Sequence, residues 1–489
     1  MASSRPLGLT AIALFVVFFF LVNTDTTFVT CQESTLQEQS QDGASHNERY
    51  VSASRGSSDG EGCGSWSDPC GTLAAAAAAA SSSRSSLSII LLPGAHDLTT
   101  AVEFVNATVS ISGPGGWPST QLVCTQGSHR GLAFLAGSSA QLSGLEVTGC
   151  SSGRGAGILV EASNITLSGV RLSNNTAMGA GSVGGGLALL DGSVATASDC
   201  EVEGNFAAKY GAGAYVHGSL LEVTGGRVKA NRLTGAGRGA GVAAFAGSTV
   251  RLAGDASVEH NEGYFGGGVM AQASHLFMEG GSSVQNNAAM YGGGLVLVAA
   301  LGSVSGAELR GNEAAHFGGA ALLESSVLRF RGGTCSGNSA TLGGCYYCSN
   351  STIEVEGSAL DYNVAGGSGG VGAYVDCDPT AAQPCSSSLE IRGSSLRNNT
   401  AAEEGGALAL RSVAVSLVQT ELSGGGAARG GALACSGESS VSLHGSVASS
   451  NAAEEEGGAA FVGDGCVLTA TGTEMSGNEA QVRGGGAFV

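Results

Sequence analysis

Short runs in which apolar and polar residues alternate recur along most of this chain. Residues 327–330 read Val-Leu-Arg-Phe, and residues 352–355 and 388–391 read Thr-Ile-Glu-Val and Ser-Leu-Glu-Ile. Because successive side chains of a strand point to opposite faces, each run predicts a short strand with one buried face. Two further strands are predicted in the same unit as the first run. One is the apolar segment at residues 320–323, and the other is the short segment at residues 334–336.

These strands belong to a repeated unit. An Asn is followed by two to six small or charged residues, then by a Gly pair and an apolar run. The spacing is 25 to 30 residues, apart from an insertion near residues 377–385 and a missing turn near residues 423–427, where Gly replaces Asn. The series begins at Asn175, and the structural turn residues that we expect after it are Asn205, Asn231, Asn261, Asn287, Asn312, Asn338, Asn363, Asn399, Asn451 and Asn478.

Three short strands in every 25 or so residues predict an all-β fold, a right-handed parallel β-helix of about 25–26 residues per coil. A helical solenoid is excluded, because the many glycines would each cost roughly 0.5–1 kcal/mol in a helix. We assign the Asn residues to turns that need a left-handed backbone, and we expect their stacked amides to form a ladder. The variable residues between Asn and the Gly pair then form an exposed loop row, where binding would lie.

The N-terminal region predicts a different organisation. Arg5 before an apolar run that ends at Val22 predicts a signal peptide over residues 1–31, with an uncleaved signal anchor as the alternative. Residues 32–61 are polar and predict a disordered linker. Residues 62–86 predict an N-terminal cap with a short Ala-rich helix, for which the alternative is a low-complexity spacer. Residues 87–489 predict the β-helix, which we expect to be incomplete at its C-terminus.

Cysteine usage fits a secreted protein. Of the 13 cysteines, 12 follow the predicted signal peptide, and an oxidising compartment should pair them. We expect Cys63 with Cys70, Cys124 with Cys150, Cys435 with Cys466, and either Cys348 with Cys377 or Cys377 with Cys385. Five Asn-X-Ser/Thr sequons predict glycosylation at Asn106, Asn164, Asn174, Asn350 and Asn398.

Two stretches resemble known families. Gly62-Cys63-Gly64, then residues 69–73, an Ala-rich segment and Pro93-Gly94 resemble the opening of secreted, pectin-lyase-like, right-handed parallel β-helix proteins. From about residue 150, the Asn and Gly-Gly-Ala-aliphatic steps, best at residues 405–408 and 430–433, resemble the polymorphic outer membrane protein repeat of chlamydial surface proteins. The family's Phe three residues before the Asn is largely missing here. The resemblance implies a surface β-helix and little about specific function.

The charge of the chain limits the kinds of partner that it could bind. The net charge is −19, so the chain would repel a nucleic-acid backbone and an anionic membrane surface. No segment after the predicted signal resembles a membrane span. A glycan or a cell-wall or surface protein is the partner that we expect, and the oligomeric state stays open.

Candidate chemistry is sparse in the sequence. His217, His260, His316 and His444 fall in different coils without an adjacent acidic cluster, so we predict no catalytic, cofactor or metal residues. Residues 403–404 and 454–456 are glutamates in one turn row, for which weak Ca²⁺ binding is the alternative to a solvated loop. Cys345 and Cys348 form a C-x-x-C step on a strand, which favours disulfide formation over a zinc or redox site.

The function that we predict is a secreted or cell-surface β-helix scaffold, adhesin-like and without an evident catalytic site. If the source is bacterial, its location would be the outer membrane. The alternative is a carbohydrate-active enzyme, a lyase, hydrolase or epimerase, acting on an acidic polysaccharide. An enzyme should bring acidic and basic side chains together on one sheet, whereas a scaffold should not.

Overall fold

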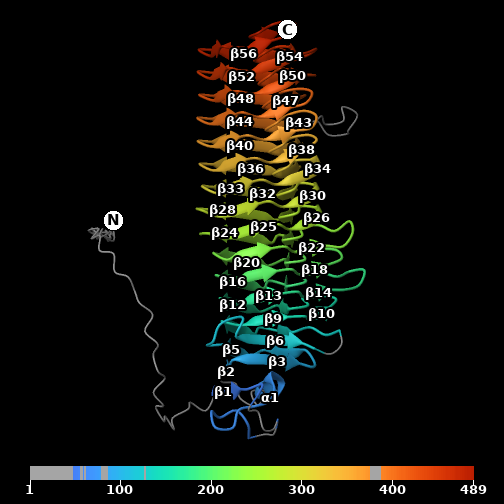
Figure 1. The fold of residues 1–489 in the computed structure, drawn as a ribbon, viewed down its shortest axis with the longest axis vertical. Helices are drawn as coiled ribbons and strands as arrows, with labels where there is room; N and C mark the ends of the chain where they lie inside the picture. Colours follow the sequence, from blue (N-terminus) through green and yellow to red (C-terminus); the bar gives the residue numbers. More distant parts are fainter. Residues whose placement is uncertain (1–47, 55–58, 60–61, 79–85, 126–127, 375–386) are drawn as a thin grey trace, which may run out of the picture. The chain divides into compact units, whose positions relative to one another are not determined.

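The computed structural model describes residues 48–54, 59, 62–78, 86–125, 128–374 and 387–489. The chain divides into two units, Met1–Ala44 and Ser45–Val489, and all described residues belong to the second. This unit is a right-handed parallel β-helix, whose coils stack in sequence order from β2 (Leu87–Leu91) to β59 (Ala487–Phe488) (Figure 1). The predicted fold class is confirmed. The predicted signal peptide lies outside the described residues.

From β8 (Ser139–Ser143) onward, each coil contains four strands, not the three that the sequence predicted. One coil consists of β31 (Leu295–Val298), β32 (Leu301–Ser305), β33 (Glu308–Arg310) and β34 (Glu313–Phe317). These four strands belong to four parallel sheets of 15, 16, 15 and 13 strands, which we name sheets C, A, B and D in that order. The fourth strand lies in the predicted loop row after the Asn. The backbone of this row therefore forms hydrogen bonds with the same row in the neighbouring coils.

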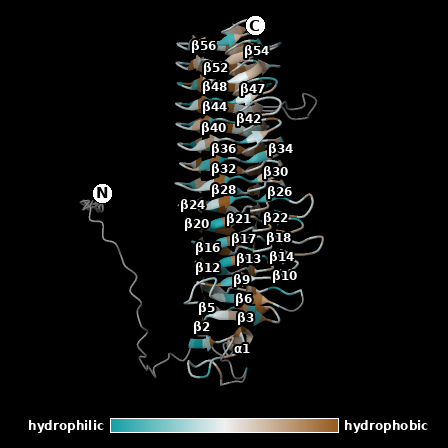
Figure 2. Ribbon diagram, in the orientation of Figure 1, coloured by the Kyte–Doolittle hydropathy of each residue, from teal (hydrophilic) through white to brown (hydrophobic). Residues whose placement is uncertain are grey.

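Alternate residues of the strands point into the interior, as predicted. In β36 (Val327–Arg331), Leu328 and Phe330 are buried and Arg329 is exposed. Hydrophobic and hydrophilic residues are accordingly interspersed in the coils (Figure 2). The pairings keep corresponding residues opposite one another, as in Leu328 opposite Ile353. One continuous hydrophobic core of small aliphatic side chains runs through the stack.

Buried asparagines connect the coils at the turn before sheet D. The Oδ1 atom of Asn287 accepts hydrogen bonds from the backbone N–H of Asn261 at 3.0 Å and from its Nδ2 at 2.9 Å. The Nδ2 atom of Asn287 donates to the Val258 carbonyl at 2.9 Å and to Oδ1 of Asn312 at 3.0 Å. The Asn287 side chain is only 1% exposed. Its amide oxygen and its amide nitrogen both have hydrogen-bond partners, so its burial leaves no polar atom without a partner. The expected amide ladder is present.

The reason that we gave for Asn at this turn is wrong. None of the ladder asparagines has a positive φ. The residue immediately before each one does, and these residues are Asn174, Gly204, Ala230, His260, Asn286, Gly311, Gly337, Tyr362, Asn398, Ser450 and Gly477. The left-handed position accepts many residue types, while the next position is almost always Asn. Selection for Asn therefore comes from its four side-chain hydrogen bonds and not from its backbone.

Gly425 interrupts the ladder, as the sequence predicted. Its backbone N–H still donates to Oδ1 of Asn451 at 2.8 Å, but it offers no side-chain acceptor to Asn399. A second polar ladder, which the sequence did not predict, lies at the turn before sheet A. There the backbone N–H of Ser138 donates to Oγ of Ser163, and the row continues coil by coil.

The N-terminal end is covered by a helix, as expected. Helix α1 (Leu73–Ala78) begins after Thr72, whose Oγ1 accepts a hydrogen bond from the N–H of Ala75 at 3.2 Å. Leu73 and Ala76 are buried in the core cluster. The predicted linker needs correction, because its residues Glu48–Val51 form β1, which pairs with β2 and extends sheet A.

Four disulfides link described cysteines. Three join pairs named from the sequence: Cys63–Cys70, Cys124–Cys150 and Cys435–Cys466. The fourth, Cys335–Cys345, was not predicted. It removes Cys345 from the C-x-x-C step, whose second member, Cys348, is buried in β39 (Tyr346–Ser349). Cys377 and Cys385 lie outside the described residues, so their pairing stays a prediction.

Removing one ladder amide should destabilise the stack. Asn287→Ala leaves the N–H and one Nδ2 proton of Asn261 without their acceptor, and Val258 and Asn312 without a donor. At about 1–3 kcal/mol for each buried group left unpaired, we expect a loss of roughly 3 kcal/mol or more in the free energy of unfolding. Gln141→Ala, which removes an exposed amide, is the control and should change it by less than about 0.5 kcal/mol. Equal denaturation midpoints for the two variants would contradict the ladder's role.

Candidate functional site

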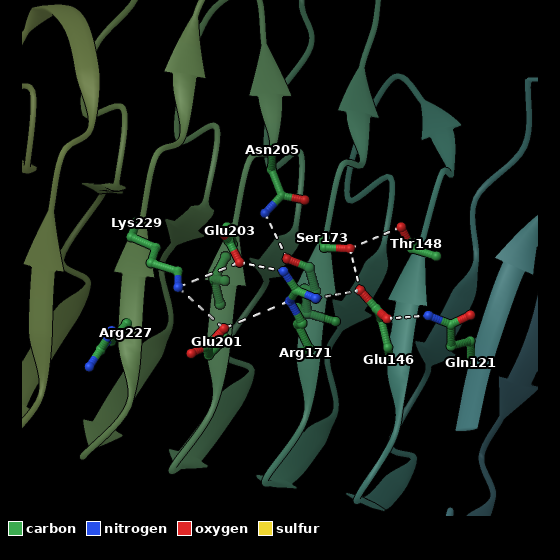
Figure 3. A network of polar contacts seen from close by, with 12 residues as sticks. Gln121, Glu146, Thr148, Arg171, Ser173, Glu201, Glu203, Asn205, Arg227 and Lys229 are labelled. Carbon is green, nitrogen blue, oxygen red and sulfur yellow. Dashed lines mark hydrogen bonds and ion pairs between the residues drawn. The ribbon is translucent and has the colours of Figure 1, made fainter. Parts of the chain in front are cut away.

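Acidic and basic side chains meet on the outer face of sheet B. They come from β9 (Glu146–Thr148), β13 (Arg171–Ser173), β17 (Glu201–Glu203) and β21 (Arg227–Lys229), and Figure 3 shows them converging on Arg171. The guanidinium lies 3.4 Å from Glu146, 3.7 Å from Glu201 and 2.6 Å from Glu203. Lys229 lies 3.5 Å from Glu201 and 3.6 Å from Glu203.

A loop before β6 (Thr120–Cys124) adds to this network. The Arg171 guanidinium lies over the Trp117 ring at 5.0 Å from its centroid, in a cation–π contact. Gln121 donates to Glu146 at 2.7 Å, and Ser173 donates to the same carboxylate at 2.6 Å. Glu146 is 3% exposed, so its charge is held by hydrogen bonds and an ion pair in place of water.

Every carboxylate of this network forms an ion pair with Arg171 or Lys229. Burial acts to raise the pKa of Glu203, but the hydrogen bond from Arg171 and the charge of Lys229 outweigh burial, and the pKa lies below its ordinary value. A general acid in a glycosidase needs a raised pKa, which is the opposite direction. The arrangement can hold coils together, because its ion pairs join side chains of successive coils.

Aligning the coils on the ladder residue reveals a signal for these residues that we missed. Glu146, Arg171, Glu201 and Arg227 each lie four positions before the turn residue of their coil, at 150, 175, 205 and 231. The position therefore alternates in charge from one coil to the next. The pattern is visible only between equivalent positions of successive coils and not between neighbouring residues along the chain.

A second surface feature runs along the edge between sheets D and C. The residue just before each Gly pair lies opposite its equivalent in the next coil, and these residues form what we call the covering column: Arg154, Val183, Tyr210, Arg238, Phe265, Tyr291, Phe317, Leu342, Ser368, Glu404, Arg429, Glu456 and Arg483. These residues belong to the variable row, in which the sequence analysis predicted binding. The column changes its chemistry along the stack while the Asn and Gly residues stay the same.

Aromatic rings dominate the middle of the covering column. The ring centroids of Phe265 and Tyr291 are 5.0 Å apart, and those of Tyr291 and Phe317 are 5.6 Å apart. Tyr347 of the neighbouring sheet C packs against this row, 4.6 Å from Phe317, and Arg238 lies over Phe265 at 5.4 Å. These side chains are neither fully buried nor fully exposed. The rings therefore present one continuous, half-exposed surface along several coils.

The covering column packs against an outward-facing row of sheet C. This row, the base column, consists of residues paired in register: Ala188, Tyr215, Ala243, Met270, Val296, Leu322, Tyr347, Ala373, Ala409, Ala434 and Phe461. Met270 and Val296 point away from the core, yet each is only 1% exposed. Part of the aromatic row is thus structural, because it shields an apolar sheet face from water.

The other residues predicted from the sequence are scattered. His217 lies at the end of β19 (Ala214–His217), and His260, His316 and His444 are exposed in three other coils. Two of them contact the columns described above: the ring of His316 lies 5.1 Å from that of Tyr291, and the ring of His217 lies 6.2 Å from that of Tyr215. In the described part of the chain, no group of three or more His, Cys, Asp or Glu residues is placed to hold a metal ion. The five sequon asparagines are all exposed, and their glycosylation stays a prediction.

Comparison with known proteins agrees with the fold. Residues 109–289 match the family model described as "Right handed beta helix region". This match supports the resemblance to pectin-lyase-like β-helix proteins, and it does not confirm the polymorphic outer membrane protein repeat. No curated protein matches the chain.

One solved structure that resembles the chain is the catalytic unit of a thermostable GH87 alpha-1,3-glucanase from Streptomyces thermodiastaticus strain HF3-3. The sequence identity is 13%, the TM-score is 0.24, and the alignment covers 82% of this chain and 65% of that one. The chain therefore spans less than two thirds of that structure. Among the residues described in the β-helix unit, no helix is long and apolar enough to cross a membrane.

The Arg171 network should contribute stability that depends on pH. We expect Arg171→Met to lower the free energy of unfolding at pH 7 by about 2 kcal/mol, between the values for exposed and fully buried ion pairs. Because the pKa of Glu203 is lowered on folding, its contribution is present above the pKa of the unfolded carboxyl and is lost as the pH falls through the folded value. The difference between wild type and variant should therefore shrink at acidic pH.

Denaturant titrations at neutral and acidic pH measure this difference. Arg329→Met is the matched control, since Arg329 pairs with Glu354 at 3.1 Å on the exposed face of sheet A. A stability loss for Arg171→Met that is as small as the control's would contradict the structural role of the network.

Proposed function

We propose that this protein is a secreted or cell-surface β-helical scaffold that binds an extended partner along its side, in the manner of an adhesin. The observation that carries the proposal is the covering column. Its side chains vary from aromatic to ionic along the stack, while the amide ladder and the Gly turns repeat. Solenoid proteins separate a constant framework from a variable binding row in this way.

Two further observations support an extracellular location. The four disulfides between described cysteines are of a kind that persists in oxidising compartments, and the N-terminal apolar run resembles a signal peptide. The partner that we propose is a glycan or a cell-wall or surface protein. We also propose that the repeat is related to the polymorphic outer membrane protein repeat, on the strength of its Asn and Gly-Gly-Ala steps.

A carbohydrate-active enzyme is the second candidate, and the Arg171 network is the observation that favours it. Acidic and basic side chains do converge there on one sheet, which is what we expected of an enzyme. Against that candidate, each carboxylate of the network is matched by Arg171 or Lys229, and Glu146 is covered. The two candidates assign different roles to Arg171. In a scaffold it would hold neighbouring coils together, and in an enzyme it would be required for catalysis.

Binding and turnover should be measured on the same preparation. We expect the protein to co-sediment with insoluble cell-wall polysaccharide and to release no soluble product from it, nor from alginate or pectin. Arg171→Met, at a temperature where it stays folded, should co-sediment as the wild type does. Product release by the wild type that Arg171→Met abolishes would overturn the scaffold proposal in favour of the enzyme.

A further inference from the structure

A hollow of about 790 Å³ opens beside the C-terminal part of the covering column. Its floor contains Ala373 and Ala409 of the base column. The covering column contributes Leu342, Ser368, Glu404 and Arg429 to one side, and the positions just before covering-column residues contribute Glu403 and Glu455. Arg411 and Ser436 form the other side. We call this feature the alanine hollow.

The hollow has a cause in the sequence. In coils nearer the N-terminus, large covering side chains such as Phe317 contact large base-column side chains such as Tyr347. At the hollow the base column becomes small at Ala373 and Ala409, and the covering column is interrupted by Ser368. Because no large side chain covers the alanines at this point, a depression forms on an otherwise packed edge.

Aromatic rings stand at both ends of the depression in the base column. Tyr347, Ala373, Ala409, Ala434 and Phe461 are successive register partners, so the two rings are four coil steps apart, or roughly 19 Å at about 4.8 Å per step. Arg429 lies over the Phe461 ring at 4.9 Å. The alanine floor therefore runs along the stack between two rings that other side chains already contact, Tyr347 through Phe317 and Phe461 through Arg429.

The polar side chains along the hollow are of both signs. Arg429 pairs with Glu404 at 2.5 Å, and Ser368 donates to Glu403 at 3.4 Å. Glu403, Glu455 and Arg411 are exposed at the rim. Carboxylates accept hydrogen bonds and guanidinium groups donate them, so the rim offers both functions to a ligand with many hydroxyl groups.

We infer that the alanine hollow binds a short segment of an uncharged polysaccharide, lying parallel to the axis of the stack. Its hydroxyl groups donate to Glu403 and Glu455 and accept from Arg411, and the apolar faces of its sugar rings lie on Ala373 and Ala409. An acidic polysaccharide is disfavoured, since the hollow has three carboxylates against two guanidinium groups and the whole chain has a net charge of −19. This inference rests on the proposed binding function and specifies its site and ligand class.

The test uses substitutions that fill the hollow with a residue type that the columns already contain. Ala409→Leu places in the base column the side chain found at Leu322 and should fill the floor. The matched control is Ala414→Leu, because Ala414 lines a separate hollow of about 460 Å³ on sheet A, together with Glu354 and Glu390. Circular dichroism and thermal unfolding establish that both variants fold as the wild type does.

Calorimetric titration of the full chain with defined hexasaccharides measures binding. The neutral probes are derived from glucans, mannan and xylan, and the acidic probes from pectin and alginate. We expect at least one neutral hexasaccharide to bind, with an affinity about ten-fold weaker for Ala409→Leu and unchanged within about two-fold for Ala414→Leu. Glu403→Gln with Glu455→Gln should also weaken it, because each amide replaces an acceptor-only group.

Three results would overturn the inference. They are the absence of binding to any neutral probe, binding that Ala409→Leu leaves unchanged, and a preference for the acidic probes. If the protein still co-sediments with cell-wall material in any of these cases, the scaffold proposal survives and only the ligand assignment fails. Release of product from a bound probe would instead contradict the scaffold proposal itself.

Discussion

The structure depends on a row of buried amides. Within the unbroken part of the ladder, an asparagine such as Asn287 joins its own coil to both neighbours through four hydrogen bonds. The four sheets, the alternation of buried residues and the serine row also fix the register of the coils, and the amides add buried contacts between coils at the turn before sheet D. The amide accepts and donates at fixed positions, so it defines where each coil ends and the next begins.

This constraint leaves the outer surface free to vary. Since the amides and glycines shape the turns, the covering column can hold Arg238, Phe265, Ser368 or Glu404 without a change in backbone. Where its side chains are large, they shield the outer face of sheet C. Where they are small, the alanine hollow opens. The same device also places the Arg171 network, since its carboxylates and cations come from equivalent positions in successive coils.

The sequence predicted the coil and its period because Asn and Gly have distinct physical roles at fixed spacing. It led us to the wrong role for Asn, since a left-handed φ and a buried amide select the same residue type at adjacent positions, as at Asn286 and Asn287. The fourth strand was missed because two residues such as Phe206–Ala207 show no alternation. Cys335–Cys345 and the Arg171 network join residues whose proximity follows from coil register, which residue-by-residue inspection does not provide.

Backbone hydrogen exchange at the ladder tests the central claim most directly. The N–H groups of Asn261, Asn287 and Asn312 each donate to a buried side-chain oxygen in the next coil, whereas Gly425 offers no such oxygen to the N–H of Asn399. If the amides hold the coils together, exchange measured by mass spectrometry on overlapping peptides should be slow at the first three positions and clearly faster at Asn399. Equal protection at all four would show that the strands alone hold the stack, and would contradict the account.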